Sequence, residues 1–93
     1  MLNQEVIKAF GLKIKKLREK KGISQEELSF QTGFHRTYIG MVERGDRNIS
    51  LSNIAVFAKV FNMNISKLLD FKSEVPSLDY TDYELKSETS ESD

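Results

Sequence analysis

Apolar side chains recur at intervals of three to four positions over most of the chain up to Phe71, which is the spacing of helices with one buried face. The first such run covers residues 5–21, and its apolar positions are Val6, Phe10, Ile14 and Leu17. Gly11 interrupts this run, and Gly22 is placed to end the helix in a left-handed conformation. No segment of useful length alternates apolar and polar residues as a strand does. The pattern therefore predicts an all-α protein.

Four shorter helices are predicted after Gly22, and polar residues mark their starts. Their expected spans are about 25–32, about 36–44, from 51 to about 61 and from 65 to about 69. The residues suited to cap three of them are Ser24, Ser50 and Asn64. Ser24 opens a capping box, because it can accept the Glu27 amide while the Glu27 side chain reaches back. The expected core face of the fourth helix is Leu51, Ile54, Phe57, Ala58 and Phe61.

The second and third predicted helices satisfy the constraints of a helix-turn-helix, in which two short helices are joined by a tight turn. Gly33 supplies the positive φ that such a turn requires. The apolar positions that must pack the two helices together are Leu28, Phe34, Ile39 and Val42. Ser29 is small enough for the helix crossing, although alanine would fit there without a hydroxyl to satisfy. These positions all comply at fixed offsets, which is a specific signal.

Residues 12–69 resemble the phage repressor and Cro type of helix-turn-helix domain, which is a five-helix bundle. The segments that carry this resemblance are SQEELSFQTG, HRTYIGMVERG, RNISL and NISKLL. Within that superfamily, HRTYIGMVERGDRNISL is most similar to the controller proteins of restriction–modification systems. Those are small homodimeric regulators that bind palindromic operators and control their own gene and the endonuclease gene. The resemblance implies a sequence-specific DNA-binding transcriptional regulator of the lambda-repressor-like type.

Base contacts are expected from the start of the third helix, because the N-terminal residues of a recognition helix face base edges in the major groove. Those residues are Arg36 and Thr37, with Met41 one turn later on the same face. Arg36 has the fork that suits guanine O6 and N7, and Met41 can make only apolar contact. The resemblance also supports Arg36, Thr37 and Tyr38 as DNA contacts.

Phosphate contacts are expected around the recognition helix. The Tyr38 hydroxyl projects to one side, where it can reach a phosphate. The resemblance places Gln25 against a phosphate, at a helix N-terminus that also presents free amides. His35 is predicted to be a turn residue or a phosphate neighbour, since histidine is a poor cap. The remaining backbone contacts are expected from Arg44, Arg47 and Asn48.

Several of these residues have a purely structural alternative. Arg36 can be a solvated charge, Met41 can fill the core, and Tyr38 can pack at the edge of the bundle. Gln25 can simply be a good helix former. Gly40 costs about 0.5–1 kcal/mol relative to alanine inside a helix, and it either permits close approach to DNA or has no role.

Arg18 and Glu43 match positions that form a buried ion pair in the resembling repressors. The resemblance therefore implies a link between the first helix and the recognition helix, and the alternative is two separate surface charges. The lysines of the first helix are expected on a solvated face, although they can also attract DNA. These lysines are Lys13, Lys15, Lys16, Lys20 and Lys21.

A homodimer is expected, because one such module reads only a few base pairs and two copies on a palindrome read more. The chain also has more apolar residues near its fifth helix than a small bundle needs inside. The predicted interface residues are Phe61, Ile65, Leu68, Leu69 and Phe71. The alternative is that all of them belong to the core.

The zero net charge of the 93-residue chain hides a division into two parts. Residues 1–71 contain 12 lysines and arginines and 7 acids, which gives +5, and they form the predicted DNA-binding domain. Residues 72–93 contain 2 lysines and 7 acids, which gives −5. This acidic tail is rich in serine and is expected to be mobile. Its apolar residues can still dock on a surface, and they are Val75, Leu78, Tyr80, Tyr83 and Leu85.

Other function classes have little support in the sequence. The chain has no cysteine, one histidine, no glycine-rich phosphate loop and no cluster with metal-ligand spacing, so we predict no enzyme, metal, cofactor or small-molecule ligand. No apolar run approaches the length of a membrane span, and we expect a cytoplasmic protein. The rival functions are an antitoxin that binds a toxin partner and a protein-interaction module on the same fold.

Overall fold

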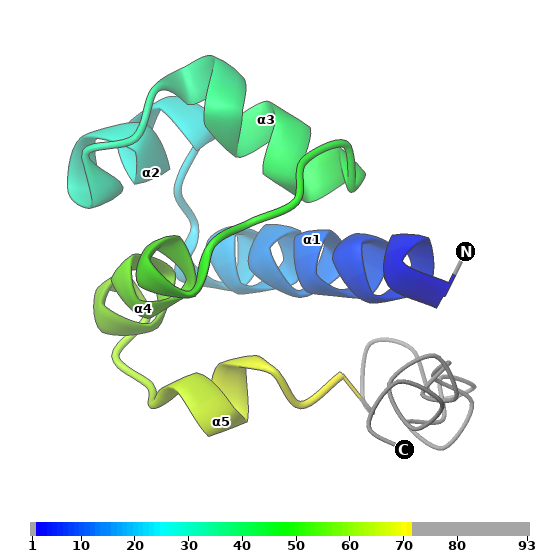
Figure 1. Cartoon of the computed structure of the whole chain (residues 1–93). Helices are drawn as coiled ribbons and strands as arrows, with labels where there is room; N and C mark the ends of the chain where they lie inside the picture. The colour runs from blue at the N-terminus through cyan, green and yellow to red at the C-terminus, as the bar shows by residue number, and fades with distance from the viewer. Residues whose placement is uncertain (1, 72–93) are drawn as a thin grey trace, which may run out of the picture.

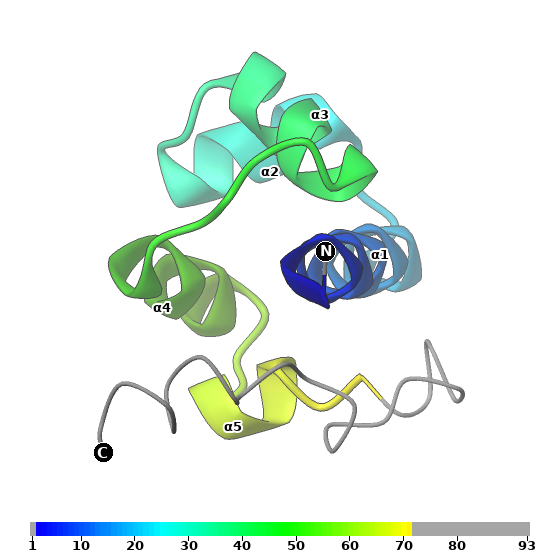
Figure 2. The same cartoon turned by 45° about the vertical axis from the view of Figure 1, so that its right-hand side comes forward.

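The computed structural model describes residues 2–71, which form five helices. They are α1 (Leu2–Lys21), α2 (Gln25–Thr32), α3 (Arg36–Arg44), α4 (Leu51–Val60) and α5 (Ile65–Leu68). α2 and α3 lie together on one side of α1 and α4, and α5 lies on the opposite side (Figure 1, Figure 2). The prediction of an all-α, five-helix fold is confirmed for the described residues. The predicted acidic tail, residues 72–93, lies outside them.

The helix boundaries follow the local chemistry that predicted them. Each predicted N-cap oxygen accepts the backbone amide three residues ahead: Ser24 from Glu27 at 3.0 Å, Ser50 from Asn53 at 3.1 Å, and Asn64 from Lys67 at 2.8 Å. α1 begins at Leu2, three residues before the predicted start. The prediction began where the apolar pattern became regular.

Phe57 of α4 lies at the centre of the core and contacts both α1 and the turn between α2 and α3. Its ring centroid is 6.0 Å from that of Phe10 on α1 and 5.3 Å from that of Phe34, which precedes α3. The fully buried large side chains are Phe57, Ile14, Leu28, Ile39, Leu68 and Val42. Because these residues come from all five helices, the core holds the helix-turn-helix against the rest of the bundle.

Gly11 marks the place where α1 crosses closest to α3. A Cβ atom added to Gly11 would lie 2.8 Å from the carbonyl oxygen of Glu43 and even closer to that of Val42. Both obstacles are backbone atoms, which cannot move aside cheaply. The glycine that interrupts the apolar pattern therefore does not break α1; it lets two helix backbones pack in contact.

Three expectations about apolar residues were wrong. Leu68 and Phe71, which were predicted to lie in the dimer interface, are buried in the core of a single protomer. They are buried because α5 and the residues directly after it close the bundle beneath α1 and α4 (Figure 2). Leu51, which was predicted to face the core, is 69% exposed, because the first turn of α4 projects beyond the core.

The lysines of α1 do not form one uniformly solvated face. Lys15, Lys16 and Lys20 are exposed, but Lys13 is only 7% exposed and donates a hydrogen bond to the carbonyl of Asp70 at 2.8 Å. Lys21 donates a hydrogen bond of 3.1 Å to the carbonyl of Val60, which is the last residue of α4. These two lysines hold the C-terminal part of the bundle against α1.

Within residues 2–71, no helix has the length and the apolar character needed to cross a membrane.

Candidate nucleic-acid interface

The turn between α2 and α3 is held by side-chain hydroxyls as well as by its glycine. Gly33 has a φ of 81° and donates its amide to the carbonyl of Ser29 at 2.8 Å. The Ser29 hydroxyl donates to the carbonyl of Phe34, and the Thr32 hydroxyl accepts the Phe34 amide at 3.1 Å. Thr32 also donates to the carbonyl of Leu28 at 2.8 Å. Ser29 therefore has a hydrogen-bonding role in the turn that alanine could not perform.

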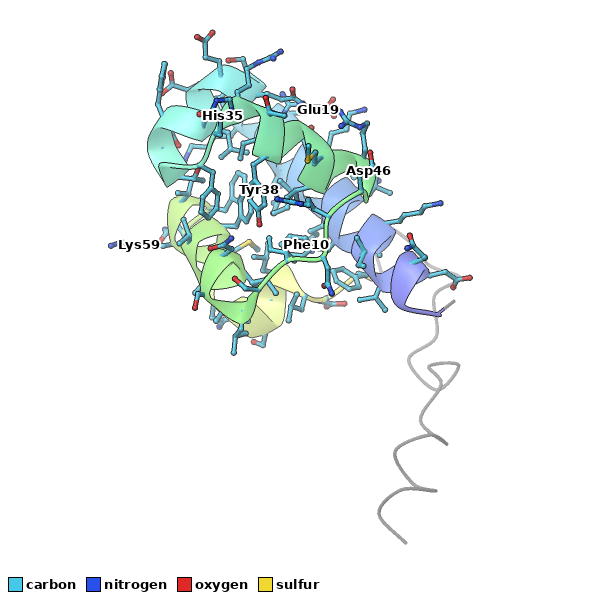
Figure 3. The ribbon with its side chains drawn as sticks, turned by 45° about the horizontal axis from the view of Figure 1, so that its top comes forward. Phe10, Glu19, His35, Tyr38, Asp46 and Lys59 are labelled. Carbon is cyan, nitrogen blue, oxygen red and sulfur yellow. The ribbon has the colours of Figure 1, made fainter. Side chains whose placement is uncertain are left out.

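His35 caps the recognition helix α3. Its Nδ1 atom accepts the backbone amide of Thr37 at 3.2 Å, and its backbone is extended, as an N-cap requires. A neutral imidazole that accepts at Nδ1 carries its proton on Nε2, so the exposed side of the ring presents a donor. The residue lies at the end of α3 opposite to Asp46 (Figure 3). Histidine is thus a functioning cap here, which was not expected.

The outer face of α3 carries the three residues predicted to contact bases. Arg36 and Thr37 are exposed, and Met41 is half-buried but does not belong to the residues that pack on the core. They lie at helical spacing and share one side of α3. A ligand with a groove wide enough for a helix can therefore contact this side of α3.

Gly40 lies on the same part of α3, and other side chains of the protein occupy the space above it. A Cβ atom at this position would lie 3.2 Å from Nη1 of Arg44 and 3.8 Å from Oε1 of Gln25. The residue is buried for this reason. The room that the glycine leaves is thus used by Arg44 and Gln25.

An ion pair connects α1 to α3, as the resemblance implied. The Nε atom of Arg18 lies 2.7 Å from Oε2 of Glu43, and the side chains are only 13% and 3% exposed. A second hydrogen bond, from Nη2 of Arg18 to Oε1 of Glu43, measures 3.1 Å. These hydrogen bonds to Glu43 raise the pKa of Arg18, although burial acts in the opposite direction. The pair is therefore bidentate, and it holds α3 against α1 on the side opposite to the outer face.

Gln25 joins this ion pair and connects it to α2. Its Nε2 atom donates to Oε1 of Glu43 at 3.0 Å, so one carboxylate receives hydrogen bonds from both α1 and α2. Nη1 of Arg18 donates to the carbonyl of Ile23 at 2.9 Å, just before α2. The position of α3 is consequently fixed relative to both earlier helices.

Tyr38 lies between α3 and α4 (Figure 3). Its ring packs edge-on against Phe34, with 5.1 Å between the centroids, and its hydroxyl accepts a hydrogen bond from Asn53 at 3.0 Å. The guanidinium of Arg47 lies 5.9 Å from the centre of the Tyr38 ring. The residue therefore packs at the edge of the bundle, and its hydroxyl hydrogen remains available to a further acceptor.

The segment after α3 places further polar groups near its C-terminal end. Nε of Arg44 lies 2.9 Å from Oδ2 of Asp46, and both side chains are more than half exposed. Arg47 and Asn48 are exposed as well. Arg44 is the last residue of α3, and Arg47 and Asn48 follow it in the connection to α4.

Some residues of the site were not found from the sequence. The bond from Asn53 to Tyr38 connects positions 15 residues apart, and no local pattern signals it. The two hydroxyls of the turn had a signal, because serine and threonine near a helix end often bond to nearby backbone groups. Within the described part of the chain, no group of three or more His, Cys, Asp or Glu side chains is placed to hold a metal ion.

Known proteins share both the sequence and the architecture of this site. The helix-turn-helix family model matches residues 14–68. The control protein C.BamHI of Bacillus amyloliquefaciens is 46% identical over 63 residues, which cover 67% of this chain and 78% of that protein. The control protein C.SmaI of Serratia marcescens is 45% identical over 56 residues, which cover 60% of this chain and 67% of that protein.

A solved structure gives the same result in three dimensions. The restriction–modification controller protein C.AhdI from Aeromonas hydrophila superposes with a TM-score of 0.64 at 42% identity. The match covers 69% of this chain and 96% of that structure. The chain therefore belongs to the helix-turn-helix family and, within it, to the control proteins represented by C.BamHI.

Proposed function

We propose that this protein is a sequence-specific transcriptional regulator that binds a palindromic operator as a homodimer and controls the genes of a restriction–modification system. The observation that carries the proposal is the outer face of α3, where Arg36 and Thr37 are exposed while the opposite face is held by the ion pair of Arg18 and Glu43. A rigid helix with an exposed, polar N-terminal part suits the major groove. The protein acts by binding DNA in the cytoplasm, without an enzymatic step.

Three side chains of α3 read the bases in this proposal. Arg36 donates two hydrogen bonds to a guanine, Thr37 bonds to a base edge or contacts a thymine methyl, and Met41 makes an apolar contact. The exposure of Arg36 and Thr37 supports these roles. Met41 is supported by its position outside the core contacts.

The surrounding residues position the protein on the phosphates. The Tyr38 hydroxyl accepts from Asn53, so it can donate its own hydrogen to a phosphate. His35 presents its Nε2 donor, and Gln25 retains a second amide hydrogen beyond the one that it gives to Glu43. The residues that complete this set, from the end of α3 and the segment after it, are Arg44, Arg47 and Asn48.

The proposed dimer interface is smaller than the sequence suggested. Leu68 and Phe71 are buried in the core of the protomer, so they are not part of this surface. The half-buried residues Phe61, Ile65 and Leu69 remain as the apolar surface near α5 that a second copy can cover. Two copies joined there would present two α3 helices to one palindrome.

Selection of binding sites from random double-stranded DNA tests the proposal. The expected product is an inverted repeat with half-site centres about one helical turn apart, 10–10.5 base pairs. Affinity for this site is expected to fall steeply with salt, because phosphate contacts release counterions. Failure to enrich any sequence would refute sequence-specific binding, and enrichment of a single unrepeated half-site would refute the homodimer.

A further inference from the structure

A shallow apolar groove lies at the C-terminal end of α1. It is formed between this end of the helix and the connection from α4 to α5. Its volume is about 280 Å³, and it is lined by Leu17, Lys20, Lys21, Val60, Phe61, Asn62 and Met63. The four apolar residues are half-buried, and two lysines stand at the rim. None of its residues belongs to the proposed DNA-binding face.

The wall of the groove has a defined shape. Asn62 adopts a φ of 57°, which is uncommon for a residue other than glycine, and this turns the chain sharply after α4. The amide of Met63 donates to the carbonyl of Ala58 at 2.9 Å, and Lys21 binds the carbonyl of Val60. These bonds hold the two sides of the groove together. A fixed apolar hollow with a basic rim is suited to a peptide that carries apolar and acidic side chains in alternation.

The chain itself contains such a segment after Phe71. Residues 75–85 read VPSLDYTDYEL, in which five apolar or aromatic side chains are interspersed with Asp79, Asp82 and Glu84. The region 72–93 has a net charge of −5, and residues 1–71 have a net charge of +5. The apolar and acidic character of the segment thus complements both the floor and the rim of the groove.

The segment begins within reach of the groove. Lys13 holds the carbonyl of Asp70 at 2.8 Å, which fixes the end of the described chain beside α1. The groove begins at Leu17, about 6 Å further along the helix at 1.5 Å per residue. The seven steps along the chain from Phe71 to Leu78 span up to about 23–25 Å when extended. The connection is therefore long enough even if it follows an indirect path.

We propose that residues 75–85 bind the groove of their own chain, with apolar side chains against Leu17, Val60 and Met63 and acidic side chains near Lys20. The acidic region is thereby attached to the side of the bundle rather than left beside the DNA-binding face. A second copy of the protein is the other conceivable occupant, because Phe61 also belongs to the proposed dimer interface.

A spin label on the full-length protein tests this directly. The chain has no cysteine, so Ser77→Cys provides a single attachment site for a nitroxide. The amide NMR signals of Lys20 and of residues 61–63 are expected to lose most of their intensity, and those of Arg36 and Thr37 are expected to keep theirs. Undiminished groove signals, or loss at Arg36 and Thr37 instead, would overturn the proposal.

Mixed samples separate the two possible occupants. Isotope-labelled protein without a nitroxide is mixed with spin-labelled protein that carries no isotope. Because the segment binds its own chain, the groove signals are expected to keep more of their intensity in the mixture than in the doubly labelled protein. Loss of signal that occurs in the mixture as strongly as in the doubly labelled protein would show that the segment of a second copy occupies the groove.

Two matched sets of substitutions test the role of charge. Changing Asp79→Asn, Asp82→Asn and Glu84→Gln is expected to restore most of the groove signals. Changing Glu88→Gln, Glu91→Gln and Asp93→Asn removes the same charge beyond the segment, and it is expected to leave the loss of signal in place. Equal effects of both sets would show that overall charge, and not this segment, governs the contact.

Discussion

At the scale of single residues, two glycines inside helices have opposite environments. A side chain at Gly11 would collide with the backbone of α3, whereas a side chain at Gly40 would meet only the far ends of the Arg44 and Gln25 side chains. The sequence shows both as unfavourable helix residues and does not separate them. Only the crossing of α1 and α3 makes Gly11 indispensable.

Replacing each glycine by alanine is expected to change stability in opposite directions. Gly11→Ala should lower the free energy of unfolding by about 1–3 kcal/mol, because the backbone must shift to admit the methyl group. Gly40→Ala should raise it by about 0.5–1 kcal/mol through helix propensity, since the exposed Arg44 can move. Urea denaturation followed by circular dichroism at one protein concentration measures both. A Gly11→Ala variant as stable as the wild type would contradict the close crossing.

The ion pair behind α3 leads to a second prediction. Arg18→Met should lower the free energy of unfolding by about 3–5 kcal/mol, because it leaves the buried carboxylate of Glu43 without its cation. Lys15→Met removes the same charge from an exposed position of α1 and should change it by less than about 0.5 kcal/mol. Adding Glu43→Leu to Arg18→Met should recover part of the loss. Equal losses in the two single variants would mean that the pair adds nothing beyond its charge.

At the scale of helices, the starts were predictable because capping chemistry is local. Ser24, Ser50 and Asn64 cap the helices that their positions predicted. The cap of α3 was less evident, because histidine rarely has this role. Its ring nitrogen nevertheless accepts the amide of Thr37 as a serine oxygen would.

The cap of the recognition helix can be tested by two substitutions at one position. His35→Ala should lower the free energy of unfolding by about 0.5–2 kcal/mol, because the Thr37 amide loses its acceptor. His35→Asn supplies a new acceptor and should retain most of the stability. Thermal and urea unfolding compare the two variants. The cap would have no energetic role if alanine and asparagine behaved alike.

The sequence predicted the helices and the turn well, and it predicted the contacts between helices less well. Periodicity and caps depend on neighbours within a few residues, so α2 to α5 appear where expected. The burial of Leu68 and Lys13 depends on how α5 folds back beneath α1, and no local sequence pattern predicts this arrangement. The ion pair of Arg18 and Glu43 was identified only through resemblance, since 25 residues separate its members.

At the scale of the whole molecule, the bundle divides its surfaces among separate tasks. α3 with the segment after it faces DNA in our proposal, the surface of α5 faces a second copy, and the groove beside the end of α1 receives the acidic segment. The first surface lies apart from the other two, since α3 and α5 are on opposite sides of α1 and α4 (Figure 1). The α5 surface and the groove adjoin each other at Phe61. All three surfaces are thus built around the same small core.

The division between core and interface near α5 can be tested by a pair of variants. Ile65→Asp places a charge on the half-buried surface and is expected to convert the proposed dimer to a folded monomer in sedimentation equilibrium. Leu68→Ala opens a cavity in the core and should lower the free energy of unfolding by about 2–5 kcal/mol while leaving the folded protein dimeric. A dimer that survives Ile65→Asp would place the interface elsewhere.

Comparing affinities for the selected operator and for a scrambled duplex tests the central claim, that the outer face of α3 reads DNA sequence. At one salt concentration, Arg36→Ala is expected to reduce the ratio of the two affinities by about 5- to 150-fold, corresponding to 1–3 kcal/mol. Lys15→Ala removes the same charge from α1 and should leave the ratio unchanged. A wild-type ratio in the Arg36→Ala variant, with affinity lowered equally for both duplexes, would contradict base recognition by α3.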